Sequence, residues 1–228
     1  MRISIIIPVL NEAERIGSLI RYLCANGGAA VSEILVVDGG SRDETERLAA
    51  DAGACVIHAA VQSRAAQMNA GAREATGDLL YFVHADTLPP PTFVYDIEDA
   101  LRQGYEMGCF AYRFDSDNFW LRINAYFNRF NFLWCQGGDK TFFIKQAVFR
   151  KLRGYNEYFV IMEEYDFLRR AMPLYPLVTI RKYALVSARK YQKNGWLRVQ
   201  IANIIAFNLF RLGVAPLRLK RFYKSMIR

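Results

Sequence analysis

Residues 3–84 alternate short, apolar, β-rich runs with segments of helical periodicity, and this alternation limits the possible folds more than any other feature. The predicted elements are, in chain order, strand 3–9, helix 12–25, strand 33–38, helix 42–52, strand 54–58, helix 63–75 and strand 79–84. Strands that alternate with helices in this way pair in parallel and are covered by the helices. The sequence therefore predicts an α/β fold with a mainly parallel sheet flanked by helices.

The pattern becomes less regular after the three prolines at 89–91. We expect a helix over 92–103, a strand over 107–114, a helix over 119–134, a strand over 141–144, a short helix ending at 152 and a helix from 163. The segment 119–134 is unusually aromatic, with Phe119, Trp120, Tyr126, Phe127, Phe130, Phe132 and Trp134. Packing in the core is the expected role of these rings, while an acceptor groove and a lipid interface stay open as alternatives.

Polar turns follow three of the predicted strands: Asn11-Glu12, Asp38 and Ala85-Asp86-Thr87. Open α/β sheets bind ligands outside the carboxyl ends of their parallel strands, so we expect these turns to converge on one site. Carboxylates there can accept hydrogen bonds from ribose hydroxyls or from a base N–H. Asp86 suits a hard divalent cation, which often takes one or two protein oxygens and completes its shell with phosphate and water.

Two basic side chains are further candidates near this edge. His84 lies two residues before Asp86 and therefore on the same side of an extended strand. Its imidazole could bind an ion such as Mn²⁺ or contact a diphosphate, and a buried structural histidine is an equal alternative. Arg64 could place positive charge near phosphates or pack on a base.

The adjacent pair Glu163-Glu164 is the candidate general base. Neighbouring carboxylates repel each other, which raises the pKa of one of them and suits it to accept a proton. Acidic residues in the first turn of a helix also favour the helix dipole, so a capping role is the structural alternative. The spacing does not distinguish Glu163 from Glu164.

The net charge of +8 is unevenly distributed, because residues 167–228 contain 14 Lys or Arg and no Asp or Glu. Such a block could meet an anionic bilayer, a nucleic acid or a phosphorylated acceptor, or form a solvated face. No recognised nucleic-acid-binding module accompanies it, so we set nucleic acid aside. Aromatic residues interleave with the basic ones, which favours the membrane surface: Trp196, Phe207, Phe210, Phe222 and Tyr223. The stretch 196–211 reads as an amphipathic helix.

The N-terminus and the cysteines suggest a cytoplasmic protein, peripheral at most on the inner face of a membrane. Pro8 and Asn11 interrupt the apolar run after Met1 too early for a signal peptide, so the run is read as a strand. No apolar stretch reaches the roughly 18 residues of a membrane span. The four cysteines form no CxxC pair, and reduced thiols are expected.

Taken together, the segments 5–12, 36–45, 64–72 and 84–87 resemble the family-2 inverting glycosyltransferases of GT-A fold, in order and in spacing. They read IIIPVLNE, VVDGGSRDET, RAAQMNAGA and HADT, and the resemblance extends over about residues 3–190. It implies a nucleotide-sugar donor, by family frequency a uridine diphosphate sugar, and a divalent metal, Mn²⁺ or Mg²⁺. It also implies transfer with inversion to an acceptor hydroxyl, with lipid-linked and cell-envelope acceptors among the options.

The resemblance assigns roles to individual residues. The donor-binding residues it implies are Pro8, Asn11, Glu12, Asp38, Arg64, Ala85 and Asp86. Asp86 matches the metal-binding end of the DxD motif, with His84 beside it, and Glu164 matches the second member of the family's Glu-Asp pair, which is usually the base. Arg189 and Lys190 are implied phosphate contacts, and Asp139 is implied at the acceptor site.

The sequence departs from the family pattern at three of these positions. His84 replaces the first aspartate of DxD, Glu164 replaces an aspartate, and Gly39 replaces a second aspartate after Asp38. The expected organisation is a GT-A domain over 1–190, with a donor half to about residue 90 and an acceptor half from 91. A basic amphipathic helical tail follows over 191–228.

Three other classes of protein fit this sequence less well. A nucleotidyltransferase should carry a Gly-rich basic loop after the first strand, where this chain reads PVLNE. A dehydrogenase should carry GxGxxG after a strand, and none is present. A non-catalytic binding protein of the same fold remains an alternative, against which Asp86 and the carboxylate pair argue. The sugar, the acceptor and the oligomeric state are left open.

Overall fold

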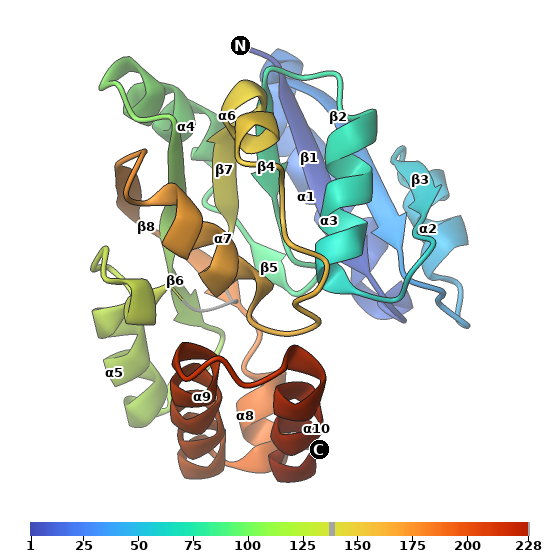
Figure 1. Ribbon diagram of the computed structural model, residues 1–228. Helices are drawn as coiled ribbons and strands as arrows, with labels where there is room; N and C mark the ends of the chain where they lie inside the picture. The colour runs from blue at the N-terminus through green and yellow to red at the C-terminus, as the bar shows by residue number, and fades with distance from the viewer. Residues whose placement is uncertain (137–139, 228) are drawn as a thin grey trace.

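One mixed eight-stranded sheet organises the protein, as seen in a computed structural model that describes residues 1–136 and 140–227 (Figure 1). Across the sheet the strands are β3 (Cys55–His58), β2 (Val31–Asp38), β1 (Ile3–Val9), β4 (Leu79–Phe82), β7 (Phe142–Lys145), β6 (Met107–Phe114), β8 (Leu177–Val186) and β5 (Thr87–Leu88). The first four pair in parallel, β7 is antiparallel to both of its neighbours, and β6 and β8 are parallel. β5 closes the edge antiparallel to β8.

Helices cover both faces of this sheet. They are α1 (Ala13–Gly27), α2 (Thr45–Asp51), α3 (Arg64–Glu74), α4 (Phe93–Arg102), α5 (Phe119–Phe127), α6 (Gln146–Lys151), α7 (Glu163–Ala171), α8 (Arg189–Asn194), α9 (Trp196–Arg211) and α10 (Pro216–Met226), with short 3₁₀ turns η1 (Gly28–Ala30) and η2 (Leu133–Cys135). Side chains alternate along each strand, so Ile5 faces the core under α1 and α4 while Ile6 faces the core under α3, α6 and α7.

The structure confirms the predicted α/β fold and corrects two parts of the predicted element list. The expected helix over 119–134 is wrong, because α5 ends at Phe127. Directly after it, the buried side chain of Asn128 donates to Tyr112 O and accepts from Tyr112 N, which turns the chain onto β6. The strands β8 and β5 were not predicted. β8 carries a run of exposed residues in its middle, and β5 has two residues.

The C-terminal helices pack together at the lower end of the molecule in Figure 1, the end toward which the parallel strands run. The first of them, α8, begins at Arg189, and Tyr191 and Val199 belong to the main core. α9 buries Val199, Ala202, Ala206 and Phe210, but Leu197 and Ile204 on its other side are about 60% exposed. Within the described residues, no helix combines the length and apolar character needed to cross a bilayer.

Candidate active site

Hydrogen bonds join the turns that follow β1 and β2 at the carboxyl edge of the sheet. Asn11 Oδ1 accepts from the backbone of Arg42 at 2.8 Å, and Ser41 Oγ accepts from the backbone of Asn11 at 2.8 Å. Asn11 has a φ of 55°, which asparagine tolerates better than most residues. Pro8 lies one residue before the end of β1 and is partly buried. The convergence that the sequence predicted at this edge is therefore present for the first two turns.

Asp38 shapes the turn after β2. Its carboxylate is 1% exposed and accepts from the backbone N–H groups of Gly40 at 2.6 Å and Ser41 at 2.7 Å, and from the Ser41 hydroxyl. Three hydrogen bonds compensate the cost of burying a charge. Asp38 thus fixes the backbone of the turn after β2.

Gln67 holds the ends of β1 and β2 together, a role that the sequence analysis did not identify. Its amide Nε2 donates to the carbonyls of Val9 and Val37, each at 2.8 Å, and so ties the ends of β1 and β2 together from α3. A Cβ atom on Gly39 would lie 3.0 Å from that nitrogen. The glycine that replaces the family's second aspartate therefore leaves the space that Gln67 occupies. Gly39 and Gln67 considered together could have indicated this contact between α3 and the turn after β2, but neither residue indicates it alone.

Asp86 lies beside Glu12 and next to the end of β8. The Asp86 carbonyl accepts from Ser187 N at 3.1 Å, and the Asp86 carboxylate contacts the Thr87 hydroxyl at 3.4 Å. Burial raises the pKa of Glu12, the charge of Arg189 opposes this, and the charge of Asp86 adds to the rise. Two close, half-buried carboxylates of this kind match the oxygen ligands that a divalent cation prefers. Ala85, before Asp86, is buried.

Arg189 faces this site, whereas Lys190 contacts a different element. Arg189 Nη2 lies 3.4 Å from Glu12 Oε1, so α8 meets the turn after β1. Lys190 Nζ lies 5.3 Å above the ring of Tyr223 on α10. Asp139, the proposed acceptor residue, falls outside the described residues.

The carboxylate pair opens α7, and each member has a different cationic partner. His84 Nε2 lies 3.4 Å from Glu164 Oε1, and Arg64 Nε lies 3.8 Å from Glu163 Oε1. Arg64, expected near the nucleoside, thus contacts the pair. His84, expected beside a metal, directs one ring nitrogen at the predicted base.

These partners divide the two glutamates chemically. Burial raises the pKa of Glu163, and the charge of Arg64 offsets part of this rise. Burial also acts on Glu164, but the hydrogen bond and charge of His84, with the charge of Arg64, lower its pKa overall. Repulsion and burial therefore favour the protonated form of Glu163, not of the predicted base. Glu163 is 5% exposed, and Glu164, whose pKa is lowered, stays ionised at neutral pH.

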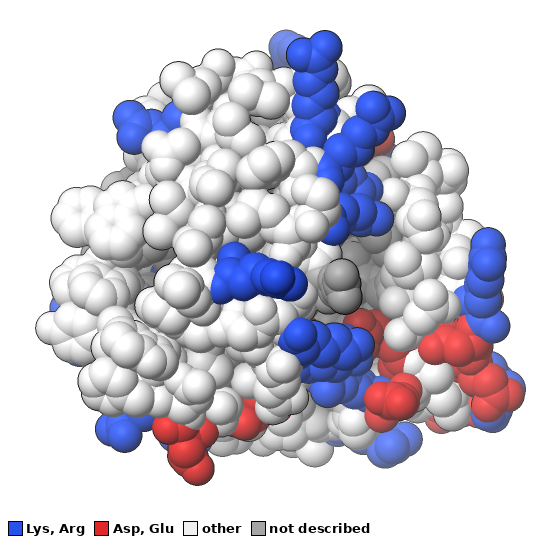
Figure 2. Space-filling model, turned by 90° about the horizontal axis from the view of Figure 1, so that it is seen from below, with Lys and Arg blue, Asp and Glu red and all other residues white. Residues whose placement is uncertain are grey.

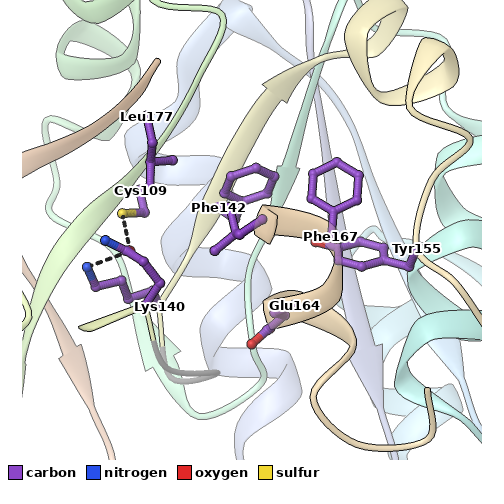
Figure 3. Close-up of a pocket in the computed structure, with 9 residues that line it drawn as sticks. Cys109, Lys140, Phe142, Tyr155, Glu164, Phe167 and Leu177 are labelled. Atoms are coloured by element: carbon purple, nitrogen blue, oxygen red, sulfur yellow. Dashed lines mark hydrogen bonds between the residues drawn. The ribbon is translucent and has the colours of Figure 1, made fainter. Parts of the chain in front are cut away.

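A narrow cavity of about 20 Å³ lies behind Glu164, roughly the space of one water molecule. Figure 3 shows the rings of Phe142, Phe167 and Tyr155 on one side, with Lys140 and Cys109 on the other. Aromatic and aliphatic side chains therefore line the side of Glu164 that faces the protein interior.

A second group of potential ligands lies apart from Asp86. The ligand atoms of Asp38, Glu46 and His58 lie within 4.8 Å of one another, and His58 Nδ1 is 3.3 Å from Glu46 Oε1. The oxygens of Asp38 are already used in its own turn.

Residues 4–162 match the family model described as Glycosyl transferase family 2. Glucosyl-3-phosphoglycerate synthase of Mycolicibacterium smegmatis is 38% identical over 101 residues, 40% of this chain and 33% of that protein. Undecaprenyl-phosphate 4-deoxy-4-formamido-L-arabinose transferase of Pseudomonas paraeruginosa is 33% identical over 115 residues, 46% of this chain and 34% of that protein. The matched segment thus spans about a third of these curated relatives.

The fold is shared with solved structures. Glucosyl-3-phosphoglycerate synthase from Mycobacterium tuberculosis, in complex with Mn²⁺, uridine-diphosphate-glucose and phosphoglyceric acid, has a TM-score of 0.65 and 22% identity, covering 93% of this chain and 80% of that chain. Another structure of that enzyme contains Mg²⁺ and uridine diphosphate. At this level of identity the likeness establishes the architecture.

Proposed function

This chain belongs to glycosyl transferase family 2, and we propose that it transfers a sugar from a nucleoside diphosphate donor, of uridine type, to an acceptor hydroxyl with inversion. The carrying observation is that Glu12, Asp38 and Asp86, from three different strand ends, share one edge of the sheet with Arg189. Such an edge suits a ligand that has both hydroxyls and phosphates. The relatives' donors support the uridine assignment for this chain by analogy.

In this proposal the donor lies along the carboxyl edge. Pro8, Asn11, Glu12 and Asp38 border the nucleoside, with Ala85 beside it, and the guanidinium of Arg189 can donate to phosphate oxygens. Binding phosphate would draw Arg189 from Glu12, with which it now pairs at 3.4 Å. The Arg189–Glu12 pair therefore holds the cationic group at the site before the donor arrives.

The residues fit a divalent ion, Mn²⁺ or Mg²⁺. Asp86 would hold it, with Glu12 nearby, whereas His84 faces Glu164. When bound, such an ion neutralises negative charge that develops on the diphosphate leaving group. Burial is the main cause of the raised pKa of Glu12, and the nearby charge of Asp86 adds to it, so a cation held by these carboxylates would relieve their repulsion.

Glu164 serves as the base in this proposal. Its ionised carboxylate accepts the proton of the acceptor hydroxyl as the hydroxyl oxygen attacks the anomeric carbon. The bond to the diphosphate oxygen breaks on the opposite face, which inverts the configuration. His84 orients the carboxylate, and Arg64 with Glu163 fixes the start of α7.

A donor screen tests the proposal. Thermal unfolding of the full chain is followed with uridine, guanosine and cytidine diphosphates and their sugars, each with Mn²⁺, Mg²⁺ or chelator. We expect uridine diphosphate with a divalent ion to raise the Tm, because a ligand that binds the folded state stabilises it. Asp86→Asn should remove the metal-dependent part of this rise. A chain that binds no nucleoside diphosphate under any metal condition is not a glycosyltransferase of this kind.

We also propose peripheral attachment to an anionic membrane surface, with a lipid-linked or otherwise hydrophobic acceptor. The basic C-terminal helices support it, and the relative that acts on undecaprenyl phosphate makes such an acceptor reasonable. Removing the residues from 196 onward would uncover the core that Val199 covers. The test therefore replaces exposed basic side chains and keeps the helices in place. Replacing Arg218, Arg221 and Lys224 by Gln should weaken flotation with anionic vesicles; unchanged flotation would remove the tail from the proposal.

A further inference from the structure

Five aromatic side chains form a closed, solvent-exposed ring beside α5. The centroids of neighbouring rings are 5.6–6.3 Å apart: Tyr126–Phe127 5.6 Å, Phe127–Trp134 6.3 Å, Trp134–Phe132 6.1 Å, Phe132–Phe130 6.3 Å and Phe130–Tyr126 6.1 Å. Their exposed fractions run from 36% for Phe130 to 60% for Phe132. We call these five residues the aromatic platform. An exposed apolar patch of this kind marks an interaction surface.

Buried polar side chains hold the backbone of the platform in place. Asn128 binds the backbone of Tyr112 in β6, and Gln136 Nε2 donates to Phe130 O at 2.9 Å. Lys140 Nζ donates to Asn128 O and, at 2.8 Å, to Gln136 Oε1. This segment therefore reverses the usual arrangement, since its amides and its lysine point inward and its rings point outward. The exposed rings are built into the fold.

The apolar surface continues from α5 onto α9. Trp120, half exposed, stacks on Trp196 with centroids 4.9 Å apart, and Leu197 and Ile201 follow on the exposed side of α9. In Figure 2, which views the molecule from below, the left part over α5 is mostly uncharged. In Figure 1, α5 and the C-terminal helices lie toward the end where the parallel strands point. A partner seated there would lie near the acceptor side of the active site.

We propose that the aromatic platform is the apolar contact by which this protein inserts into the interface of an anionic bilayer. The inference rests on the proposed membrane association and assigns its apolar contact to α5 and η2, with the basic helices supplying the electrostatic attraction. Trp, Tyr and Phe rings suit the headgroup level, where one side is apolar and the other wet. Arg129, 4.2 Å above the ring of Tyr126, can reach lipid phosphates from the same surface.

Charge favours a bilayer over a second copy of the chain. Residues 167–228 have 14 basic and no acidic residues, and α9, which continues the apolar surface, belongs to this block. Four of the 14 pair with acidic side chains from earlier in the chain, namely Arg169, Arg170, Lys182 and Arg189, so the excess charge lies mainly on the C-terminal helices. Two such surfaces would repel each other on pairing. Anionic lipids attract basic segments, by about 1 kcal/mol for each Lys or Arg near the surface. Aromatic rings and unbalanced positive charge together match a lipid surface.

The experiment compares two double variants of the full chain. Phe132→Ser with Trp134→Ser alters the platform, at 60% and 56% exposure, and Tyr95→Ser with Tyr158→Ser is the matched control, at 62% and 63% exposure elsewhere. Flotation is measured with phosphatidylcholine vesicles that contain or lack phosphatidylglycerol. We expect wild type and control to bind the anionic vesicles and the platform variant to bind at least tenfold more weakly. Thermal unfolding and uridine diphosphate binding, measured without vesicles, report fold and donor site separately.

A second measurement follows the fluorescence of Trp134. In the variant Trp120→Phe/Trp196→Phe, Trp134 is the remaining tryptophan, and its emission should shift to the blue and be quenched by brominated lipid. Equal vesicle binding by wild type and platform variant overturns the platform while leaving attachment through the basic helices standing. Absence of binding by wild type overturns both. Self-association of the wild type that the platform variant abolishes, seen by sedimentation, assigns the rings to a second copy and also overturns the inference.

Discussion

His84 illustrates how one contact changes the meaning of a motif residue. From the sequence it stands where the family has the first aspartate of DxD, and its spacing from Asp86 suggested a metal ligand. The structure directs its Nε2 at Glu164 Oε1, 3.4 Å away. Donation from this nitrogen to Glu164 fixes the orientation of the imidazole ring. His84 and Glu164, which both stand where the family has an aspartate, therefore form one hydrogen-bonded pair.

We expect His84→Ala to lower kcat at least about tenfold, which corresponds to about 1.4 kcal/mol of transition-state stabilisation. The reason is loss of the group that orients and ionises Glu164. The metal concentration needed for half-maximal activity should change little, whereas Asp86→Asn should raise it. Steady-state kinetics over a metal titration checks this. A large rise in the metal requirement of His84→Ala would assign the imidazole to the ion instead.

Glu164→Gln should lower kcat by about a hundredfold or more, the usual contribution of a general base, and leave the donor's Kd unchanged. Glu163→Gln is the adjacent control. Glu163 is buried beside Arg64, and burial favours its neutral form, so replacement by the neutral Gln should leave the transfer rate largely unchanged. Transfer assays combined with donor binding distinguish the two. Unchanged transfer by Glu164→Gln would rule out Glu164 as the base.

At the scale of elements, the donor edge depends on how closely α3 approaches β1 and β2. Gly71 lets the helix pack there, because a Cβ atom at this position would lie 2.6 Å from Ile6 Cγ2 and 3.0 Å from Val37 Cγ2. The same helix carries Gln67, which bridges the carbonyls of Val9 and Val37. The spacing between α3 and the sheet therefore also sets the geometry of the two turns that border the donor.

Gly71→Ala should destabilise the protein by about 1–3 kcal/mol, the typical cost of overpacking, despite the better helix propensity of alanine. Gly17→Ala in α1 is the control, because its Cβ would meet the nearest atom, in the flexible Arg21 side chain, at 3.4 Å. That substitution should be neutral or stabilise by up to about 1 kcal/mol. Urea unfolding measures both. Equal effects of the two changes would contradict close packing at Gly71.

Glu33 links β2 to β1 and to the turn before β4. Its Oε1 accepts from Ser4 Oγ at 2.6 Å and from the N–H and hydroxyl of Thr76 at 2.7 and 2.8 Å. Burial acts to raise the pKa of Glu33, but these hydrogen bonds lower it overall, below 4.5. A carboxyl whose pKa is lowered in the folded state contributes stability above its ordinary pKa and loses it as pH falls through the folded value.

We therefore expect Glu33→Gln to be less stable than wild type by about 1 kcal/mol at pH 7, the size of a typical hydrogen-bond contribution. The difference should shrink as the pH falls below about 4.5 and Glu33 becomes protonated. Urea unfolding of both proteins between pH 3.5 and 7, an interval chosen to span the ordinary carboxyl range, gives the comparison. A gap that widens toward low pH would contradict the sign of the shift.

Across the whole molecule, local signals predicted the donor half well and the remainder less well. Four parallel strands were visible because each is a short apolar run next to a helical pattern, and three of them are followed by a polar turn, as β1 is at Asn11. The end of α5 could not be seen, since it depends on Asn128 meeting Tyr112 on a distant strand. The pairing of His84 with Glu164 likewise joins residues 80 positions apart. Such contacts follow from the sheet order, which no local pattern contains.

The sheet order also governs when the enzyme can become active during its synthesis. The strands that end at Asn11, Asp38 and Asp86 leave the ribosome first, and they can pair with one another as β3-β2-β1-β4. Glu164 and Arg189, which contact His84 and Glu12, are translated much later. A nascent chain can thus hold the framework of the proposed donor site while it still lacks Glu164, the proposed base, and Arg189. Catalytic competence is deferred until both halves have met.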